Sequence, residues 1–335
     1  MKTLFNTLAE HKKGKKLMQT AVIVAPGEVE LQTAVIPEPA RDEVRVRIEG
    51  CGLCASNLPF WQGREWFSYP MEAGAPGHEG WGTVDGVGKD VKTVKSGDRV
   101  TLLSHHAYAD YDIAHAEHVV KLPDGLDGRP VPGEPLGCAM NILERSRVEA
   151  GMTVAVVGVG FLGALLVQLA KHTGARVIAI TRRASSLEMA KKLGADEALQ
   201  LKDPEQITEQ VNTLTGNTLC ERVIEATGEQ EPLSLAGSLT AVRGRLIVAG
   251  YHQDGLRQVN MQQWNRRGID VINAHERNPE ACVQGMRRAV EAVEEGVLNP
   301  FPLFTHTFPK QYLQQAFQLH QQKPNGFIKA LITFK

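Results

Sequence analysis

The chain contains two regions in which hydrophobic residues are spaced differently. From Gln19 to about Val120, short apolar runs alternate with polar residues and are interrupted by Gly and Pro, as in residues 43–48, which read EVRVRI. Alternation with a period of two is typical of strands that bury one face. The pattern predicts a β-rich domain with functional loops over residues 18–135, preceded by a polar extension at residues 1–17.

After about Pro135, β-branched apolar runs alternate with longer helical patterns. This alternation is typical of a parallel sheet that is covered by helices, and it predicts a doubly wound α/β domain over residues 136–278. Short strands flanking an amphipathic helix near the end of the sequence predict that residues 279–335 rejoin the first domain. The strands expected in the parallel sheet are 154–157, 177–180, 222–225, 245–249 and 270–273.

Charge and cysteine content narrow the class of partner and the compartment. The chain has 37 Lys and Arg against 38 Asp and Glu, so it offers no basic field for nucleic acid or anionic lipid, and a small-molecule partner is expected. Its five cysteines are too few and too scattered for a disulfide scaffold, which favours a reducing, cytoplasmic location. The longest apolar run, 155–170, is interrupted by glycines and is shorter than the roughly 20 residues of a spanning helix, so no membrane segment is expected.

A glycine triplet follows the first strand of the predicted parallel sheet. Gly158 permits a tight turn, Gly160 lets backbone amides approach a pyrophosphate, and Gly163 lets the following helix pack closely on the strand. The N-terminus of that helix would face the anion. This strand–turn–helix–strand setting predicts a dinucleotide site, and the alternative is a tight turn without a ligand.

Thr181, Arg182 and Arg183 follow the second strand, where NAD enzymes usually carry an acid that binds the ribose 2′-hydroxyl. A carboxylate would repel a 2′-phosphate, whereas a hydroxyl and two guanidinium groups can bind one through charge-assisted hydrogen bonds. We therefore predict NADP(H) as the cofactor rather than NAD(H). In the alternative interpretation, the arginines form only a solvated loop and Thr181 tolerates both cofactors.

Cys51 and Cys54 form a Cys-x-x-Cys pair just after an expected strand. The thioredoxin-like surroundings of a redox motif are missing, and the next cysteine is too distant for a four-cysteine zinc site. Downstream, His78 supplies an imidazole and Glu134 a carboxylate. A thiolate, an imidazole and a carboxylate can bind zinc and leave one tetrahedral position open for water or substrate. Taken singly, His78 is also compatible with an ordinary loop histidine and Glu134 with an acid that begins a helix.

Several short motifs occur in an order that matches one enzyme family. They are GLCASN at 52–57, the aromatic pair FW at 60–61, GHE at 77–79, GDRV at 97–100 and EPL at 134–136. Together they resemble the zinc-dependent medium-chain dehydrogenases, and more the polyol branch than the ethanol-oxidising one. The resemblance covers nearly everything after Met18. It implies an α/β protein with a GroES-like β-rich catalytic domain and a Rossmann domain with a doubly wound parallel sheet.

The resemblance also implies roles for individual residues. Cys54, not Cys51, would be the thiolate ligand, and His78 with either Glu79 or Glu134 would complete the metal site. Ser56 matches the hydroxyl that relays the alcohol proton. Lys329 resembles the basic residue that contacts the pyrophosphate.

Three departures from the family pattern change these expectations. The cysteine-rich lobe that often follows GDRV is missing, so we predict one catalytic Zn²⁺ and no structural zinc. Asn57 stands where an aspartate is usual, and Pro59 replaces the histidine that often ends the proton relay. The proton must then leave by another route, for which His105 and His106 are candidates, unless they are only surface histidines.

The resulting hypothesis is a zinc-dependent oxidoreductase that transfers hydride between NADP(H) and a secondary alcohol or ketone, with a polyol, sugar or cyclitol as the substrate class. A strand near 268–273 resembles the family's dimer-forming edge, so a homodimer or higher homo-oligomer is expected. One alternative is a zinc-free NADPH-dependent quinone or enone reductase. Another is a non-catalytic dinucleotide-binding sensor.

Overall fold

The computed structural model describes residues 16–334, which form two compact units. Unit 1 contains the chain up to Glu134 together with His306–Gln322 and the segment from Ala330. Unit 2 contains Pro135–Thr305 and Lys323–Lys329. Residues 1–15 of the predicted extension lie outside the described part, and the first strand begins at Leu17. The sequence predicts a domain boundary at residue 278, and unit 2 continues past that residue to Thr305. The boundary itself stays a prediction.

Unit 1 is built on a seven-stranded sheet with the order β14-β15-β3-β4-β5-β7, in which β6 also pairs with β3. A separate antiparallel pair is formed by β1 and β2. On β3 the apolar side chains Val44, Val46 and Ile48 are buried, as the period-two pattern predicts. The strands are β1 (Leu17–Ala25), β2 (Glu28–Val35), β3 (Glu43–Gly52), β4 (Glu79–Val87), β5 (Arg99–Leu102), β6 (Tyr111–His115), β7 (Val119–Lys121), β14 (Phe304–Pro309) and β15 (Lys329–Thr333).

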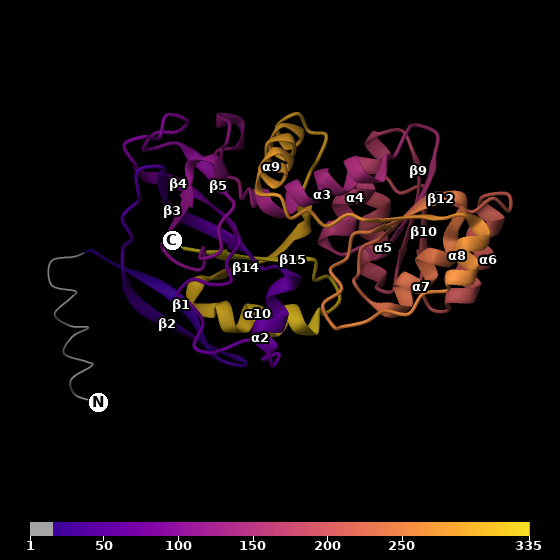
Figure 1. Ribbon diagram of the computed structural model, residues 1–335, viewed down its shortest axis with the longest axis horizontal. Coiled ribbons are helices and arrows are strands. Elements are labelled where there is room, and N and C mark those ends of the chain that lie inside the picture. Colours follow the sequence, from indigo (N-terminus) through magenta and orange to yellow (C-terminus); the bar gives the residue numbers. More distant parts are fainter. Residues whose placement is uncertain (1–15, 335) are drawn as a thin grey trace. The chain divides into compact units, whose positions relative to one another are not determined.

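Two helices of unit 1 lie side by side, although they are far apart in the sequence (Figure 1). The short helix α2 (Leu58–Gln62) packs against α10 (Leu313–Gln322). Trp61 of α2 stacks on Phe317 of α10 with ring centroids 5.1 Å apart and an interplanar angle of 4°. This buried contact holds the short helix α2 in place, and the turn η1 (Ala55–Asn57) directly precedes that helix. The other short 3-10 turns are η2 (Ala116–His118), η3 (Asp124–Leu126), η4 (Phe301–Leu303) and η5 (Lys310–Tyr312).

Unit 2 is a six-stranded parallel sheet with the order β10-β9-β8-β11-β12-β13, and helices pack around it (Figure 1). The order reverses direction between β8 and β11, and such a switch point is where open α/β sheets bind their ligands. The strands are β8 (Thr153–Val157), β9 (Arg176–Thr181), β10 (Glu197–Gln200), β11 (Cys220–Glu225), β12 (Thr240–Val248) and β13 (Asp270–Asn273). The helices are α3 (Gly133–Ser146), α4 (Phe161–His172), α5 (Ala184–Lys192), α6 (Pro204–Leu214), α7 (Gln230–Leu239), α8 (Met261–Arg267) and α9 (Pro279–Glu294).

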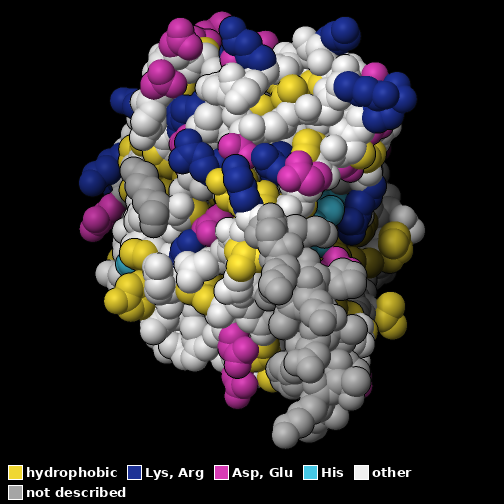
Figure 2. Space-filling view, turned by 90° about the vertical axis from the view of Figure 1, so that its left-hand side faces the viewer, with side chains coloured by type: hydrophobic (Ala, Val, Ile, Leu, Met, Phe, Trp, Pro, Cys, Tyr) yellow, Lys and Arg dark blue, Asp and Glu magenta, His cyan; other side chains and the backbone are white. Residues whose placement is uncertain are grey.

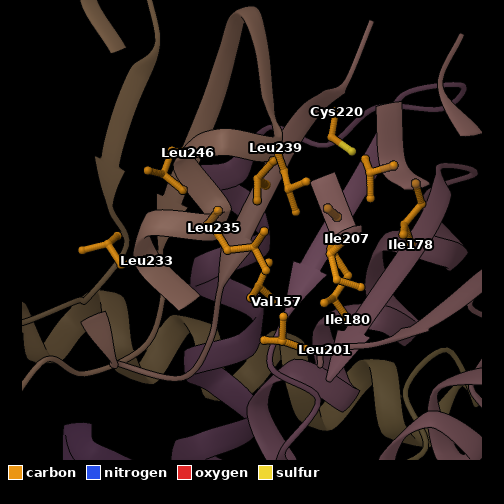
Figure 3. Packing of buried hydrophobic residues seen from close by; sticks show 14 of the residues in the cluster. Val157, Ile178, Ile180, Leu201, Ile207, Cys220, Leu233, Leu235, Leu239 and Leu246 are labelled. Atoms are coloured by element: carbon orange, nitrogen blue, oxygen red, sulfur yellow. The ribbon is translucent and has the colours of Figure 1, made fainter. Parts of the chain in front are cut away.

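The core of unit 2 explains why its strands read as continuous apolar runs. Val157, Ile178 and Ile180 from β8 and β9 belong to one buried cluster with Leu235 and Leu239 of α7 (Figure 3). A parallel strand is covered on both faces, so nearly every one of its positions must be apolar. The structure confirms the predicted fold class, a β-rich unit and a doubly wound parallel-sheet unit.

Basic and acidic side chains are interspersed on the face shown in Figure 2, in line with 37 basic and 38 acidic residues in the chain. Among residues 16–334, no helix combines the length and the apolar character that crossing a membrane requires.

Candidate active site

The structure brings three of the predicted metal ligands together. Cys54 follows the end of β3, and His78 and Glu79 stand at the start of β4. Because β3 and β4 are antiparallel neighbours with Gly52 opposite Glu79, the end of β3 lies beside the start of β4. One ligand atom from each of Cys54, His78 and Glu79 lies within 4.8 Å of the others. Cys54 and His78 are partly buried, and Glu79 is fully buried.

The backbone of Gly52 makes room for the Glu79 carboxylate. A Cβ added at Gly52 would overlap Oε2 of Glu79, so any side chain at this position must displace that carboxylate. We predict that Gly52→Ala weakens zinc binding about 10- to 100-fold, the usual cost of disturbing a group that orients a metal ligand. Metal titration with a competing chelator would measure it.

The control for this prediction is Gly86→Ala on the same strand pair. A Cβ at Gly86 would meet only the end of the Arg45 side chain, at 3.4 Å. Equal zinc affinities of the two variants would contradict the proposed role of Glu79.

His78 is held in an orientation suited to a metal ligand. Its Nδ1 lies 3.1 Å from the Pro76 carbonyl oxygen, which can only accept, so Nδ1 carries the proton and Nε2 is left for a ligand bond. Burial alone would lower the pKa of His78. The hydrogen bond to Cys54 and the negative charges of Cys54, Glu134 and Glu79 outweigh burial and raise that pKa to about 10. Such surroundings attract a cation, and a metal ion would take the place of the proton.

Glu134 stands apart from the three-residue group. It lies in the first turn of α3 and is not among the ligand atoms that lie within 4.8 Å of one another. Its charge nevertheless acts on His78, so it lies in the same electrostatic neighbourhood. The geometry favours Glu79 as the direct carboxylate ligand, with Glu134 beside it.

Ser56, which is partly buried, begins a series of hydrogen bonds that the sequence did not predict. The Ser56 hydroxyl donates to Asn57 Oδ1 at 3.5 Å, Asn57 Nδ2 donates to the Tyr108 hydroxyl at 2.7 Å, and that hydroxyl donates to the Gly52 carbonyl oxygen at 3.3 Å. Tyr108 is completely buried, and its burial raises the pKa of the phenol far above the ordinary value. This series of hydrogen bonds orients Ser56 and ties it to the strand that leads to Cys54.

The two histidines of the shortened lobe differ in their surroundings. His106 is partly exposed and its Nε2 lies 2.9 Å from the Glu72 carboxylate. His105 is exposed, and its partial desolvation, followed by the positive charges of His78 and His106, lowers its pKa. Of the two, His105 is the one whose pKa is lowered by the charge of His78.

The glycine triplet has the geometry that a dinucleotide turn needs. Gly158 has φ 97°, a left-handed conformation that disfavours side chains. Nothing lies within 4 Å of a Cβ added at Gly160, whereas one at Gly163 would overlap the Gly158 carbonyl oxygen. The turn thus keeps space above Gly160 and packs α4 closely on β8 through Gly163, as predicted.

The three residues at and just after the end of β9 differ in their surroundings. Thr181 is buried at the end of the strand, and Arg182 is exposed. Arg183 is partly buried, and Nη1 donates to the Phe327 carbonyl oxygen at 2.6 Å. Lys329 is buried in the same unit, with Nζ 4.8 Å from the ring centroid of Phe161, the first residue of α4. Lys329 thus lies beside the glycine turn.

Comparison with known proteins identifies the family. The model of the alcohol dehydrogenase GroES-like domain matches residues 40–124, and that of the zinc-binding dehydrogenase matches residues 162–292. The chain belongs to the zinc-dependent medium-chain alcohol/polyol dehydrogenases. It is therefore an alcohol/polyol oxidoreductase, and membership of this family supports small-molecule alcohol substrates, a nucleotide cofactor and zinc.

Relatives of this family match over most of the chain. D-arabitol-phosphate dehydrogenase of Enterococcus avium is 28% identical over 84% of this chain and 87% of its own length. Sorbitol dehydrogenase of Gallus gallus is 29% identical over 89% of this chain and 91% of its own length. The crystal structure of an oxidoreductase of unknown specificity from Escherichia coli has a TM-score of 0.87 at 23% identity, covering 96% of this chain and 100% of that one, which shows the shared fold.

The ligand atoms of this dehydrogenase fit zinc by their chemistry. Thiolate sulfur, imidazole nitrogen and carboxylate oxygen are all zinc ligands, and a site with three protein ligands is the arrangement of catalytic rather than structural zinc. A partly buried site with several negative charges also favours a divalent cation.

Proposed function

We propose that the chain is a zinc-containing dehydrogenase that prefers NADP(H) and interconverts a secondary alcohol of the polyol, sugar or cyclitol class with its ketone. The observation that carries the proposal is the grouping of Cys54, His78 and Glu79 with ligand atoms within 4.8 Å. Three such ligands leave one position open for the hydroxyl oxygen of a substrate.

In this proposal, some residues of unit 1 would bind the metal and Ser56 would take part in proton transfer. When bound, zinc supplies a Lewis acid that lowers the pKa of the alcohol, and NADP(H) supplies the hydride acceptor or donor. Cys54, His78 and Glu79 would hold the metal, with Glu134 nearby. The Ser56 hydroxyl donates to Asn57 Oδ1 and keeps lone pairs that can face the alcohol. To relay the alcohol proton, Ser56 would give up its own hydroxyl proton to another acceptor as it takes the new one, so its O–H would turn away from Asn57.

The proton accepted by Ser56 must leave by a route other than Asn57. The Asn57 amide is already a hydrogen-bond donor to Tyr108 and has no basic atom for a further proton. His105 and His106, which lie between β5 and β6, are the candidates for that route.

The end of β9 supports the preference for NADP(H). It carries Thr181 and two arginines where a carboxylate would bind the 2′-hydroxyl of NAD. Arg182 is exposed and could bind a 2′-phosphate, whereas one nitrogen of Arg183 already donates a hydrogen bond to the Phe327 carbonyl oxygen. Lys329, beside the glycine turn, fits a contact to the pyrophosphate.

Relatives support the substrate class, and one strand supports an oligomer. The two relatives described above are dehydrogenases of D-arabitol phosphate and of sorbitol, both polyols.

Strand β13 is the last strand in the order of its sheet and exposes Val271, so it offers an edge to a second copy of the chain. We propose a homodimer or higher homo-oligomer through that edge.

The proposal is tested by metal analysis and a substrate screen of the purified protein. We expect about one zinc per chain, and oxidation of one or more polyols that is faster with NADP⁺ than with NAD⁺, followed by the absorbance of the reduced nicotinamide. Full activity of a metal-free preparation would refute the proposed zinc chemistry and favour the zinc-free quinone or enone reductase instead.

A further inference from the structure

A buried charged network lies at the carboxyl end of β11, outside the residues that the sequence singled out. Glu225, the last residue of β11, is fully buried. Its Oε1 accepts hydrogen bonds from the backbone amides of Thr227 at 2.6 Å and Gly228 at 3.0 Å. Its Oε2 lies 3.0 Å from Nε2 of His252. The carboxylate thus holds its own turn and a residue that follows β12.

Arg257 completes the network and defines the protonation of His252. Arg257 Nε lies 3.0 Å from Nδ1 of His252, and its other nitrogens donate to the carbonyl oxygens of Asp254 and Gly228, each at 3.1 Å. Because arginine can only donate, Nδ1 must accept, and Nε2 carries the proton that it donates to Glu225. His252 is therefore a neutral bridge between a buried carboxylate and a guanidinium group.

The network joins two turns at the switch point of the sheet. The amides of Ala249 and Gly250 donate to the Glu225 carbonyl oxygen at 2.8 Å each, so the segment after β12 lies against the end of β11. The turn that follows β11 also lies against the glycine turn. This close approach is shown by Gly158, where an added Cβ would overlap Thr227. The segment 249–257 is thus fixed to the glycine turn through Glu225 and His252.

The direction of the bound cofactor follows from the strand order. The proposed function places the pyrophosphate at the glycine turn after β8 and the adenosine ribose at the end of β9. In the order β9-β8-β11-β12, the other half of the cofactor must lie on the opposite side of β8. The nicotinamide half then passes over the ends of β11 and β12, where segment 249–257 lies.

We propose that His252 is a positioning residue for the nicotinamide half of the cofactor. It acts through segment 249–257, whose backbone it holds in place between Glu225 and Arg257. The proposal rests on the proposed function for the placement of the adenosine half. It predicts that removal of His252 weakens binding of the nicotinamide half alone.

The test compares NADPH with 2′-phospho-ADP-ribose, which lacks the nicotinamide. We expect His252→Leu to raise the Kd of NADPH about tenfold or more, the effect of losing hydrogen bonds to charged groups, and to leave the Kd of 2′-phospho-ADP-ribose unchanged. His252→Gln should restore NADPH binding, because its Oε1 can accept from Arg257 while its Nε2 donates to Glu225. Calorimetry or NADPH fluorescence gives both constants.

Two further variants separate a specific effect from general damage. Arg257→Gln removes the guanidinium group from the partly buried end of the network. This variant should also bind NADPH more weakly and 2′-phospho-ADP-ribose unchanged, and it serves as the test even if His252→Leu fails to fold. His172→Leu, at an exposed position of α4, should leave both constants unchanged.

Equal weakening of both ligands, or no weakening in His252→Leu and Arg257→Gln, would overturn the inference while leaving the proposed function intact. Failure of the native protein to bind either ligand would instead refute the proposed dinucleotide site, and the inference with it.

Discussion

Replacement of Cys54 by serine is expected to abolish stoichiometric zinc binding and to lower kcat by about three orders of magnitude. The magnitude follows from the several kcal/mol of transition-state stabilisation that a Lewis-acid metal supplies. Cys54 is the thiolate of the group whose ligand atoms lie within 4.8 Å, and a serine hydroxyl is a much poorer zinc ligand at neutral pH. Metal content and steady-state kinetics of the same preparation give both quantities.

Cys51→Ser is the matched control for this prediction. Cys51 lies three residues earlier on β3, is fully buried, and its Sγ donates to the neighbouring Gly52 carbonyl oxygen at 3.5 Å. It should keep zinc and most of the activity, with a modest loss of stability. If Cys51→Ser loses the metal and Cys54→Ser retains it, the ligand assignment is wrong.

Removal of the Arg182 side chain is expected to lower kcat/KM for NADP⁺ about 10- to 100-fold and to leave that for NAD⁺ unchanged. This range corresponds to the loss of one or two hydrogen bonds between charged groups. Arg182 is a better choice than Arg183, whose guanidinium also holds the Phe327 carbonyl oxygen, so that its loss would disturb segment 323–329 as well. Parallel kinetics with the two cofactors measure the change in preference.

The control for Arg182→Ala is Lys192→Ala, which removes an exposed positive charge from the end of α5. It should change neither constant, because the attraction of a distant exposed charge is largely screened by salt. A similar decrease for both cofactors in Arg182→Ala would show that the residue supports the fold rather than the choice of cofactor.

The parallel sheet could be predicted closely because its central strands are buried on both faces. The expected runs 154–157 and 177–180 lie within β8 and β9. Strand β10 was missed, since Glu197–Gln200 is short, contains polar residues and is only partly buried. At the edge of a sheet, backbone pairing rather than side-chain burial decides that a strand forms.

The residues of the candidate metal site could be named from the sequence, but their arrangement could not. The choice between Glu79 and Glu134 depends on the register that sets Gly52 opposite Glu79, which joins distant parts of the chain. Tyr108 gave no signal because its partner Asn57 is 51 positions away. Local patterns report burial and turns, whereas contacts between distant residues need the folded backbone.

The end of β3, which leads to Cys54, receives its second neighbour only from a much later part of the chain, whereas residues 43–47 of the same strand already pair with β6. Leu331 of β15 pairs with Gly52, and the Leu53 amide donates to the Ala330 carbonyl oxygen at 3.0 Å. Synthesis runs from the N-terminus, so the ribosome completes nearly all of the parallel-sheet unit before this neighbour emerges. We therefore expect the segment that carries Cys54 to gain its full strand pairing, and the candidate metal site its final form, only after residue 331 has been synthesised.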